Sequence, residues 1–540
     1  MKSFLILNHV YDNIIMALSC FNTNDVVIST IILLLLGMSV AFVYLFSNFH
    51  HNNNNKNKND DSIKKLSSSS SISSSISSSS TTTTNTTDEI SSMTSMKTST
   101  TTKPSKIITW NEFKKHTGST SKEQKCWIAL YNKVYDITNF APVHPGGDLI
   151  FQYAGRDATD EFEAFHLPRV KRRLAAFYIG DLVDAPVELP VTKDYRELKQ
   201  YLWDEGWFEA DLSYYVYKDI LALCILLIGA YFITMGESTT TRTIIGGSFV
   251  GLALQQVAFV AHDAGHRGIT HPIPGGGINW LGWLHGSICF GVSIEMWNDE
   301  HSAHHAMTMR PHEDPQFKYL PVFLISSKEV DRFGDLSKIE QKIAKWLVPF
   351  QHYTLIPISV IIGRFNLHII SLIYAIKSRK YYDIGGLLLY LAWFGSLTSY
   401  LPLYERIPFV LVSYIVAGIL HIQLTISHLA TDSFTAEEDE KEQFFAFQCK
   451  TTRNINSTEW DDWFHGGLQF QIEHHLFPQM PRHNLVKVKP FVENLCRKYN
   501  LPYQSTSFMG AVGHCLSDFR RLSFFLEDIV YPHEIMPKNE

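Results

Sequence analysis

The chain has 540 residues, which is long for one domain and suits two or three. Its formal net charge of −6 carries no general signature of nucleic-acid binding, so no nucleic-acid partner is expected. Its seven cysteines are scattered without a Cys-x2-Cys spacing, which indicates neither a disulfide framework nor a thiolate metal site.

The N-terminal part is predicted to hold a membrane anchor and a tether. After a short segment of residues 1–25, residues 26–46 are uncharged and strongly apolar, long enough to span a hydrocarbon core of about 30 Å. More lysines follow this run than precede it, so the positive-inside rule places its C-terminal side in the cytoplasm. Residues 47–106 are rich in Asn, Ser and Thr and cannot bury enough apolar surface to fold, so we expect a disordered linker.

A small soluble domain of mixed α and β structure is predicted for residues 107–185. Two short runs, Trp127–Leu130 and Lys133–Thr138, flank Tyr131-Asn132 and indicate a β-hairpin. Residues 186–213 are expected to be a linker to the next domain.

The rest of the chain is predicted to be a helical membrane domain, residues 214–510, with a C-terminal tail of residues 511–540. Two apolar stretches, Ile278–Ile294 and Val348–Ile376, are expected to lie in the membrane interface. Four other segments are candidate membrane spans, namely Ile220–Met235, Thr243–Ala261, Ile384–Leu403 and Ile407–Ser427.

Three clusters of metal-binding side chains stand beside these apolar segments. Positions i, i+3 and i+4 share one face of a helix, so each cluster can direct two or three side chains to one point. Together they offer seven imidazoles and one amide oxygen, too many for one four-coordinate zinc site, which predicts two metal ions in a nitrogen-rich cage. The candidate ligands are His262 and His266, then His301, His304 and His305, then Gln471, His474 and His475.

The predicted topology brings the three clusters to one membrane face. Two spans lie between the small domain and the first cluster, and two more precede the third cluster. If Ile278–Ile294 crossed the bilayer, the first and second clusters would be separated, which one metal centre forbids. The even number of spans therefore places all three clusters on the face that holds the small domain.

The small domain carries four informative motifs, namely Lys133–Thr138, His144–Gly147, Asp157–Asp160 and Phe165-His166. Through these motifs it resembles cytochrome b5. This resemblance implies one haem b, whose iron is held from both sides by His144 and His166. Two axial imidazoles leave no open coordination position, so such a haem transfers electrons and does not activate oxygen.

An electron carrier beside a two-metal site favours a redox metal, and iron over zinc. Over residues 107–510 the chain is similar to the membrane fatty acid desaturases, and specifically to their cytochrome b5-fused front-end branch. The three clusters match the histidine boxes of that family, and Gln471 stands where the front-end branch has Gln in place of His. The segments Trp463–Phe470 and Leu476–His483, on either side of the third box, strengthen the match.

This resemblance has several implications. The fold would be an all-α polytopic membrane domain with a cytosolic diiron cap, and the box residues would be catalytic as ligands of two non-haem irons. One further histidine ligand is implied after the last span, and His428 is best placed for it. The reaction would use O2 to insert a cis double bond at delta-5 or delta-6 into a polyunsaturated or monounsaturated acyl chain.

The implied partners are a fatty acyl lipid or acyl-CoA substrate, O2, membrane lipid and an NADH-cytochrome b5 reductase as electron donor. The expected location is the endoplasmic reticulum membrane, multi-pass, with the haem domain and histidine boxes on the cytosolic face.

Three alternatives stay open: a sphingolipid delta-8 desaturase, a cytochrome b5-fused lipid hydroxylase, and a membrane-tethered electron carrier with vestigial boxes. The family usually begins near the haem domain, so residues 1–92 are either a genuine anchor or precede the true start at Met93 or Met96.

Overall fold

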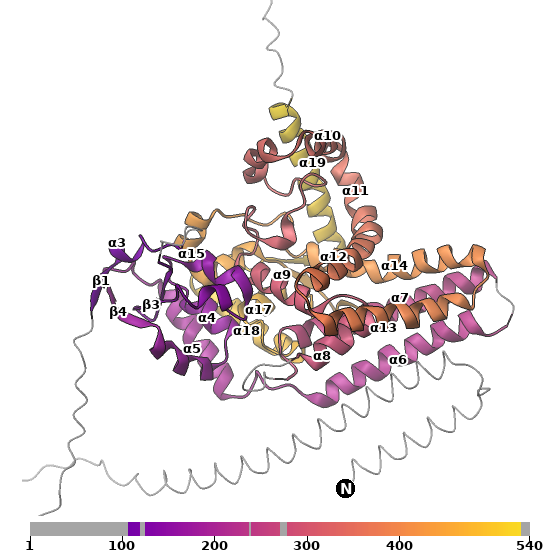
Figure 1. Cartoon of the computed structure of the whole chain (residues 1–540), viewed down its shortest axis with the longest axis horizontal. Helices are drawn as coiled ribbons and strands as arrows, with labels where there is room; N and C mark the ends of the chain where they lie inside the picture. The colour runs from indigo at the N-terminus through magenta and orange to yellow at the C-terminus, as the bar shows by residue number, and fades with distance from the viewer. Residues whose placement is uncertain (1–105, 119–124, 237–238, 271–277, 531–540) are drawn as a thin grey trace, which may run out of the picture. The chain divides into compact units, whose positions relative to one another are not determined.

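The computed structural model describes residues 106–118, 125–236, 239–270 and 278–530. The predicted N-terminal segment, the extra span and the linker up to residue 105 lie outside these residues. From Lys106 onward the described chain belongs to one unit, in which a small α+β domain precedes a mostly helical domain (Figure 1).

The small domain is built on a four-stranded sheet with the strand order β1-β4-β3-β2. The predicted hairpin is confirmed, because β2 and β3 pair antiparallel around Tyr131 and Asn132. These two residues have φ of 55° and 56°, the left-handed backbone that a two-residue hairpin turn requires. The elements of this domain are β1 (Ile107–Thr109), α3 (Trp110–Phe113), β2 (Trp127–Leu130), β3 (Lys133–Asp136), η1 (Ala141–Val143), η2 (Gly147–Tyr153), α4 (Thr159–Phe165), η3 (Pro168–Ala176) and β4 (Tyr178–Val183).

The prediction that residues 186–213 are only a linker is wrong. Pro190–Asp204 form helix α5, whose buried Val191, Tyr195 and Leu202 recur at helical spacing and join a core cluster of the helical domain. The Tyr195 hydroxyl donates to the backbone carbonyl of Leu476 at 2.8 Å. This apolar stripe, readable in the sequence, makes α5 a structural part of the interface between the two domains.

Among the described residues, the helical domain has five long helices (α6, α7, α13, α14 and α19) and several shorter ones. Its elements are α6 (Leu212–Thr234), α7 (Thr240–Gly265), α8 (Trp280–Gly282), η4 (Trp283–Phe290), α9 (Ile294–Ala306), η5 (Pro315–Phe317), η6 (Ser327–Asp335), α10 (Lys338–Leu347), η7 (Val348–Phe350), α11 (Gln351–Pro357), η8 (Ile358–Ile362), α12 (Gly363–Lys377), α13 (Tyr381–Ser399), α14 (Leu403–Thr425), α15 (Ala436–Thr451), α16 (Asp462–His465), α17 (Gln471–Leu476), α18 (Arg482–Lys498) and α19 (Phe508–Val530), with the strands β5 (Asn454–Asn456) and β6 (Ser505–Ser507) paired in parallel.

By length and composition, four helical stretches of the described chain can cross a membrane. Three of them, α6, α7 and α14, overlap predicted spans. They lie side by side with α13, as Figure 1 shows and their mutual contacts confirm.

The fourth stretch differs from the prediction. It is Lys338–Lys377, most of which was predicted to lie in the interface, and it contains Pro349 and Pro357 at the breaks between its short helices. The predicted span Ile384–Leu403 is instead α13, which is not among the four. Its first turn carries Tyr381-Tyr382-Asp383, and Asp383 is buried where it accepts a hydrogen bond from Ser287 at 2.7 Å.

The segment Ile278–Ile294 is not one of the stretches long enough to cross a membrane. It holds the short helices α8 and η4, which pack against the end of α7 and against α13. Among the described residues, no membrane-length helix lies between the first and second histidine clusters.

The described part of the predicted tail, residues 511–530, is also folded. Helix α19 buries Ala511, Cys515 and Phe519 in one core cluster, and the rings of Phe519 and Phe323 lie 5.8 Å apart. The spacing of these buried residues is that of an amphipathic helix, so α19 belongs to the helical domain.

Candidate metal centres

The histidine-rich clusters of the sequence lie at the ends of helices that converge on one place. His262 lies in the last turn of α7 and His266 caps that helix. The helix α9 carries the second cluster and the short helix α17 the third. Because i, i+3 and i+4 share a helix face, each element presents its imidazoles in the same direction.

One group of four imidazoles comes from three elements. The ligand nitrogens of its members all lie within 4.8 Å of one another, close enough to hold one metal ion. The members are His262, His266, His301 and His474.

A second group lies next to the first and contains His304, His428 and His475, whose ligand nitrogens also lie within 4.8 Å of one another. The structure thus brings His428, which follows α14, to two of the box histidines. The ring centroids of His428 and His304 are 4.7 Å apart, and those of His428 and His475 are 4.6 Å apart.

His305 lies between the two groups. Its ring centroid is 4.6 Å from that of His301 in the first group and 4.1 Å from that of His475 in the second. Its Nε2 lies 3.1 Å from Nε2 of His301. Two adjacent nitrogen-rich groups joined by a shared imidazole fit two metal ions better than one.

Several imidazole nitrogens of the two groups have no hydrogen-bond partner among the described residues. The Nε2 atoms of His262, His266, His474 and His475 are buried without a hydrogen bond. A buried polar atom left unpaired costs about 1–3 kcal/mol, and native proteins avoid it. Metal ions at these positions would supply the missing partners, so the side chains present fit a metal-binding role.

The protonation state of these histidines also fits. Burial lowers the pKa of His301, His305 and His475 well below the usual value, with neighbouring imidazoles adding to the shift. They are therefore neutral near pH 7, the form that binds a metal ion.

Three polar groups outside the clusters contact the Nδ1 atoms of the second group. The Oδ2 of Asp314 lies 2.8 Å from Nδ1 of His304, and the Oε1 of Gln448 lies 3.0 Å from Nδ1 of His475. The backbone carbonyl of Thr451 lies 3.2 Å from Nδ1 of His428. Each acceptor favours the tautomer with the proton on Nδ1 and leaves Nε2 for a metal ion.

Sequence reasoning missed Asp314 and Gln448. Of the acidic residues beside the boxes, Asp263 contacts an imidazole, with its Oδ1 3.4 Å from Nδ1 of His262. Asp299 instead accepts from Tyr374, and Glu473 accepts from Asn454.

Asp263 is itself held by two side chains. It accepts a hydrogen bond from the Tyr215 hydroxyl at 2.7 Å, and its Oδ2 lies 2.9 Å from Nε of Arg482. The carboxylate thereby links His262 to the start of α6 and the start of α18.

Gln471, at the first position of the third box, is buried and its side chain lies near that of His428. Its amide therefore lies at the second group, beside the histidine that comes from outside the boxes.

The small domain brings together the other predicted pair, His144 and His166. Their ring centroids are 6.0 Å apart, which leaves a gap for a flat group between two facing imidazoles. Nδ1 of His166 lies 3.0 Å from the carbonyl of Phe162, so its Nε2 is available to a metal. Burial lowers the pKa of His166 to about 4, which keeps this imidazole neutral. The pair fits axial ligation of a haem iron.

Two hydrogen bonds join the segments that hold these two sites. The Tyr153 hydroxyl, at the end of η2, donates to the carbonyl of Ala306, the residue after His305, at 2.7 Å. The amide of Gln479, four residues after His475, donates to the carbonyl of Phe165, the residue before His166, at 2.8 Å.

Charged contacts reinforce this interface on helix α15. Asp439 lies 3.4 Å from Arg156 of the small domain and 3.1 Å from Arg310 of the helical domain. Lys114 pairs with Glu440 at 2.6 Å. The small domain is therefore held against the segments that carry the second and third boxes.

Comparisons with known proteins agree with this geometry. Residues 240–507 match the family described as "Fatty acid desaturase", and residues 109–183 match the "Cytochrome b5-like Heme/Steroid binding domain".

Several curated relatives are similar to large parts of this chain. A "Delta(8)-fatty-acid desaturase" of Helianthus annuus is 35% identical over 79% of this chain and 93% of that protein. An "Acyl-lipid (9-3)-desaturase" of Borago officinalis is 32% identical over 80% of this chain and 96% of that protein. A "Delta 8-(E)-sphingolipid desaturase" of Candida albicans is 34% identical over 58% of this chain and 55% of that protein.

Proposed function

We propose a desaturation reaction, since this chain belongs to the front-end branch of the membrane fatty acid desaturases and has a cytochrome b5 domain fused ahead of the desaturase domain. In this reaction the enzyme inserts one double bond between an existing double bond and the headgroup end of a lipid chain. The enzyme is an oxidoreductase with haem and non-haem iron as cofactors. The observation that carries the proposal is the pair of adjacent imidazole groups joined by His305.

The overall reaction converts –CH2–CH2– to –CH=CH–. One O2, two electrons and two protons are consumed, and two water molecules form, so atoms and charge balance. Two irons held by the histidine groups would supply the oxidant for the two C–H bonds, and a haem held by His144 and His166 would supply electrons.

We assign the metal-binding roles to the side chains whose free nitrogens face the groups, with Gln471 beside His428 in the second group. The proposed catalytic ligands are His262, His266, His301, His304, His305, Gln471, His474 and His475, with His428 as the additional iron ligand. For the haem, the proposed axial ligands are His144 and His166.

The protein side chains perform three tasks in this proposal. Asp314 and Gln448 keep protons on Nδ1 of His304 and His475, so that Nε2 stays free at each. Trp297 packs against the rings of His262 and His266, with centroids 5.2 Å away from each, and keeps water from that side. Tyr153 and Gln479 hold the haem domain in place for electron transfer.

The position of the new bond is the finer part of the proposal. A delta-5 or delta-6 bond in an acyl chain was predicted from the front-end resemblance. Two of the relatives described above are named for delta-8, which favours delta-8 as a second candidate, on a fatty acyl or sphingoid chain. One of these names specifies an E double bond, so the E or Z geometry of the new bond should be determined as well.

We also propose the cellular setting. The long apolar helices suit a multi-pass protein of the endoplasmic reticulum membrane, with the haem domain and the histidine groups on the cytosolic face. An NADH-cytochrome b5 reductase is the proposed electron donor, and an acyl lipid or acyl-CoA the proposed substrate.

The test is lipid analysis of yeast that expresses the full chain and is fed acyl substrates for delta-5 and delta-6 insertion. Gas chromatography of fatty acids and mass spectrometry of sphingoid bases would be run together. We expect a new double bond in one lipid class, absent in His304→Ala and retained in His312→Ala, a histidine whose side chain is 42% exposed. A hydroxylated product, or none from an iron-loaded and haem-loaded protein, would contradict the proposal.

A further inference from the structure

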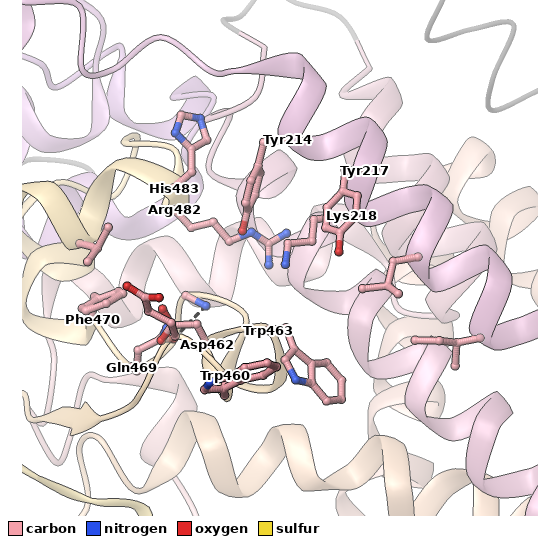
Figure 2. Close-up of a pocket in the computed structure, with 15 residues that line it drawn as sticks. Tyr214, Tyr217, Lys218, Trp460, Asp462, Trp463, Gln469, Phe470, Arg482 and His483 are labelled. Carbon is pink, nitrogen blue, oxygen red and sulfur yellow. Dashed lines mark hydrogen bonds between the residues drawn. The ribbon is translucent and has the colours of Figure 1, made fainter. Parts of the chain in front are cut away.

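A pocket with a volume of about 670 Å³ lies outside the histidine groups. Its walls come from the first turns of α6, the segment of residues 459–470 and the start of α18 (Figure 2). This volume is in the range of sites that bind small organic groups. Nothing in the reaction described above uses this pocket.

One wall of the pocket carries positive charge. Arg482 is only 5% exposed, and its Nη1 donates to the carbonyl of Gly466 at 2.8 Å. Its Nη2 is buried without a hydrogen-bond partner among the described residues. Figure 2 shows the guanidinium beside Lys218, whose Nζ lies 5.2 Å from the ring centroid of Tyr214. Nε of Arg482 pairs with Asp263 at 2.9 Å, but no ion pair of Lys218 occurs within the described chain. Lys218 and the free Nη2 of Arg482 therefore leave this wall able to accept an anionic group.

The opposite wall suits a cation. Trp460 and Trp463 lie across the pocket from Arg482 and Lys218 (Figure 2), and their side chains are 89% and 39% exposed. Glu459 and Asp462 line the pocket beside these indoles. Aromatic faces next to carboxylates are the surroundings in which proteins hold ammonium groups.

The glycines of the adjoining segment make room for the arginine. Gly467 has φ of +96°, and a Cβ added there would lie 2.8 Å from Cβ of Arg482. The Gly466 carbonyl is the acceptor for Nη1. A side chain at Gly467 would push Arg482 out of its position in the pocket wall.

The pocket lies at the end of a membrane-length helix and next to a residue that contacts the first histidine group. Tyr214 and Lys218 belong to the first turns of α6, and aromatic and basic residues at the end of a membrane-spanning helix meet lipid headgroups. Arg482 in the pocket wall contacts Asp263, which contacts His262. A headgroup bound here would place the first carbons of its chain near the histidine groups.

We infer that this pocket binds the zwitterionic headgroup of the substrate lipid, a phosphodiester beside an ammonium group. The phosphate would lie at Arg482 and Lys218, and the ammonium at Trp460, Trp463 and Glu459. This inference rests on the proposed function and names the carrier of its substrate chain. Coenzyme A, with several phosphates and no ammonium group, matches only one of the two walls.

The first test is binding of dihexanoylphosphatidylcholine, below its micelle concentration, to the purified full-length protein by titration calorimetry. We expect the affinity to fall at least about fivefold in Lys218→Gln and in Trp460→Ala, the size of one lost charge or cation–π contact. The matched controls are Lys342→Gln and Trp346→Ala on α10, where Trp346 is 72% exposed. Equal affinity in the pocket variants and the controls would overturn the assignment.

Two further ligands test the nature of the headgroup. Dihexanoylphosphatidic acid and coenzyme A should each bind the unaltered protein more weakly than the choline lipid. If either binds as tightly, the pocket recognises phosphate alone and the cation wall has no role. Since binding is measured without turnover, a protein that binds the headgroup but forms no double bond would contradict the proposed function and leave this site standing.

A crosslinking measurement on the unaltered protein tests the inference even if the variants fail to fold. A phosphatidylcholine with a photoreactive group on its headgroup should label peptides from residues 214–218 or 459–463 of the unaltered protein. Labels confined to other parts of the chain would overturn the inference.

Discussion

The Oδ2 of Asp314 lies 2.8 Å from Nδ1 of His304, and both side chains are buried. The same oxygen accepts from the backbone N–H of Met309 at 3.0 Å, while Oδ1 accepts from that of Gln316 at 3.0 Å. The carboxylate is thus fixed by the loop after α9 and fixes the imidazole in turn. A carboxylate in this position sets the tautomer and raises the basicity of a metal-binding histidine.

Replacing this carboxylate by an amide should weaken iron binding without unfolding the protein. We expect Asp314→Asn to lower iron affinity about 10- to 100-fold, the usual cost of losing such a partner. Iron per chain after dialysis is the measurement, and haem per chain should not change. Asp331→Asn, at an exposed aspartate, is the control. Full iron occupancy in Asp314→Asn under limiting iron would refute this role.

Gln448 should be needed for both stability and metal loading. Its Nε2 donates to the carbonyl of His305 at 2.7 Å and its Oε1 faces Nδ1 of His475. Gln448→Leu removes both bonds and leaves only the longer contacts of the Thr308 hydroxyl, at 3.4 Å to the His305 carbonyl and 3.2 Å to Nδ1 of His475. Each lost bond costs about 1 kcal/mol. We expect a lower Tm and less iron per chain, both measured on the purified protein. Gln341→Leu on α10, whose amide bonds to a partly exposed backbone carbonyl, should change neither.

Gly265 should not tolerate even one added methyl group. A Cβ there would lie 2.1 Å from Cζ3 of Trp297, the indole that packs on the rings of the first group. We expect Gly265→Ala to displace Trp297 and reduce both Tm and iron content. Gly395→Ala in α13 is the matched control, because a Cβ there meets nothing within 4 Å. Alanine is the better helix former, so the control should be neutral or slightly stabilising.

The contacts between the two domains should govern electron transfer. Tyr153→Phe and Gln479→Leu each remove one interdomain hydrogen bond, worth about 1 kcal/mol. We expect normal haem and iron content but slower reoxidation of the reduced haem in stopped-flow absorbance with O2 and substrate present. Tyr178→Phe, whose hydroxyl bonds to Asp181 within the small domain, is the control. An unchanged rate in both interface variants would mean that these bonds do not position the haem domain.

Removal of iron should abolish the function of the iron site without affecting the haem. Treatment with an Fe(II) chelator should abolish double-bond formation and leave the haem spectrum intact, because the two sites are built from different histidines. Activity should return with Fe(II) and not with Zn(II), which has no redox chemistry. The iron-free protein should also melt at a lower temperature, since its buried Nε2 atoms then lack partners. Full activity after loss of iron would contradict the diiron assignment.

Much of the site was predictable because it is local. His301, His304 and His305 are three and four residues apart on one helix, so their common direction follows from helix geometry alone. The hairpin at Tyr131-Asn132 is local in the same sense. Two segments were misjudged although their patterns were readable: α5 and α19 carry apolar residues at helical spacing and are folded parts of the protein.

The sequence by itself determined the box spacings, the histidine pair of the haem domain and three of the membrane-length helices, α6, α7 and α14, since each depends on residues close together in the chain. Only the tertiary structure decided that Asp314 and Gln448 support the imidazoles, that Tyr153 and Gln479 join the two domains, and that Arg482 lines a pocket opposite Trp460. These contacts link different elements, most of them far apart in the chain. Which residues meet there is set by how whole elements pack against each other, which no local pattern records.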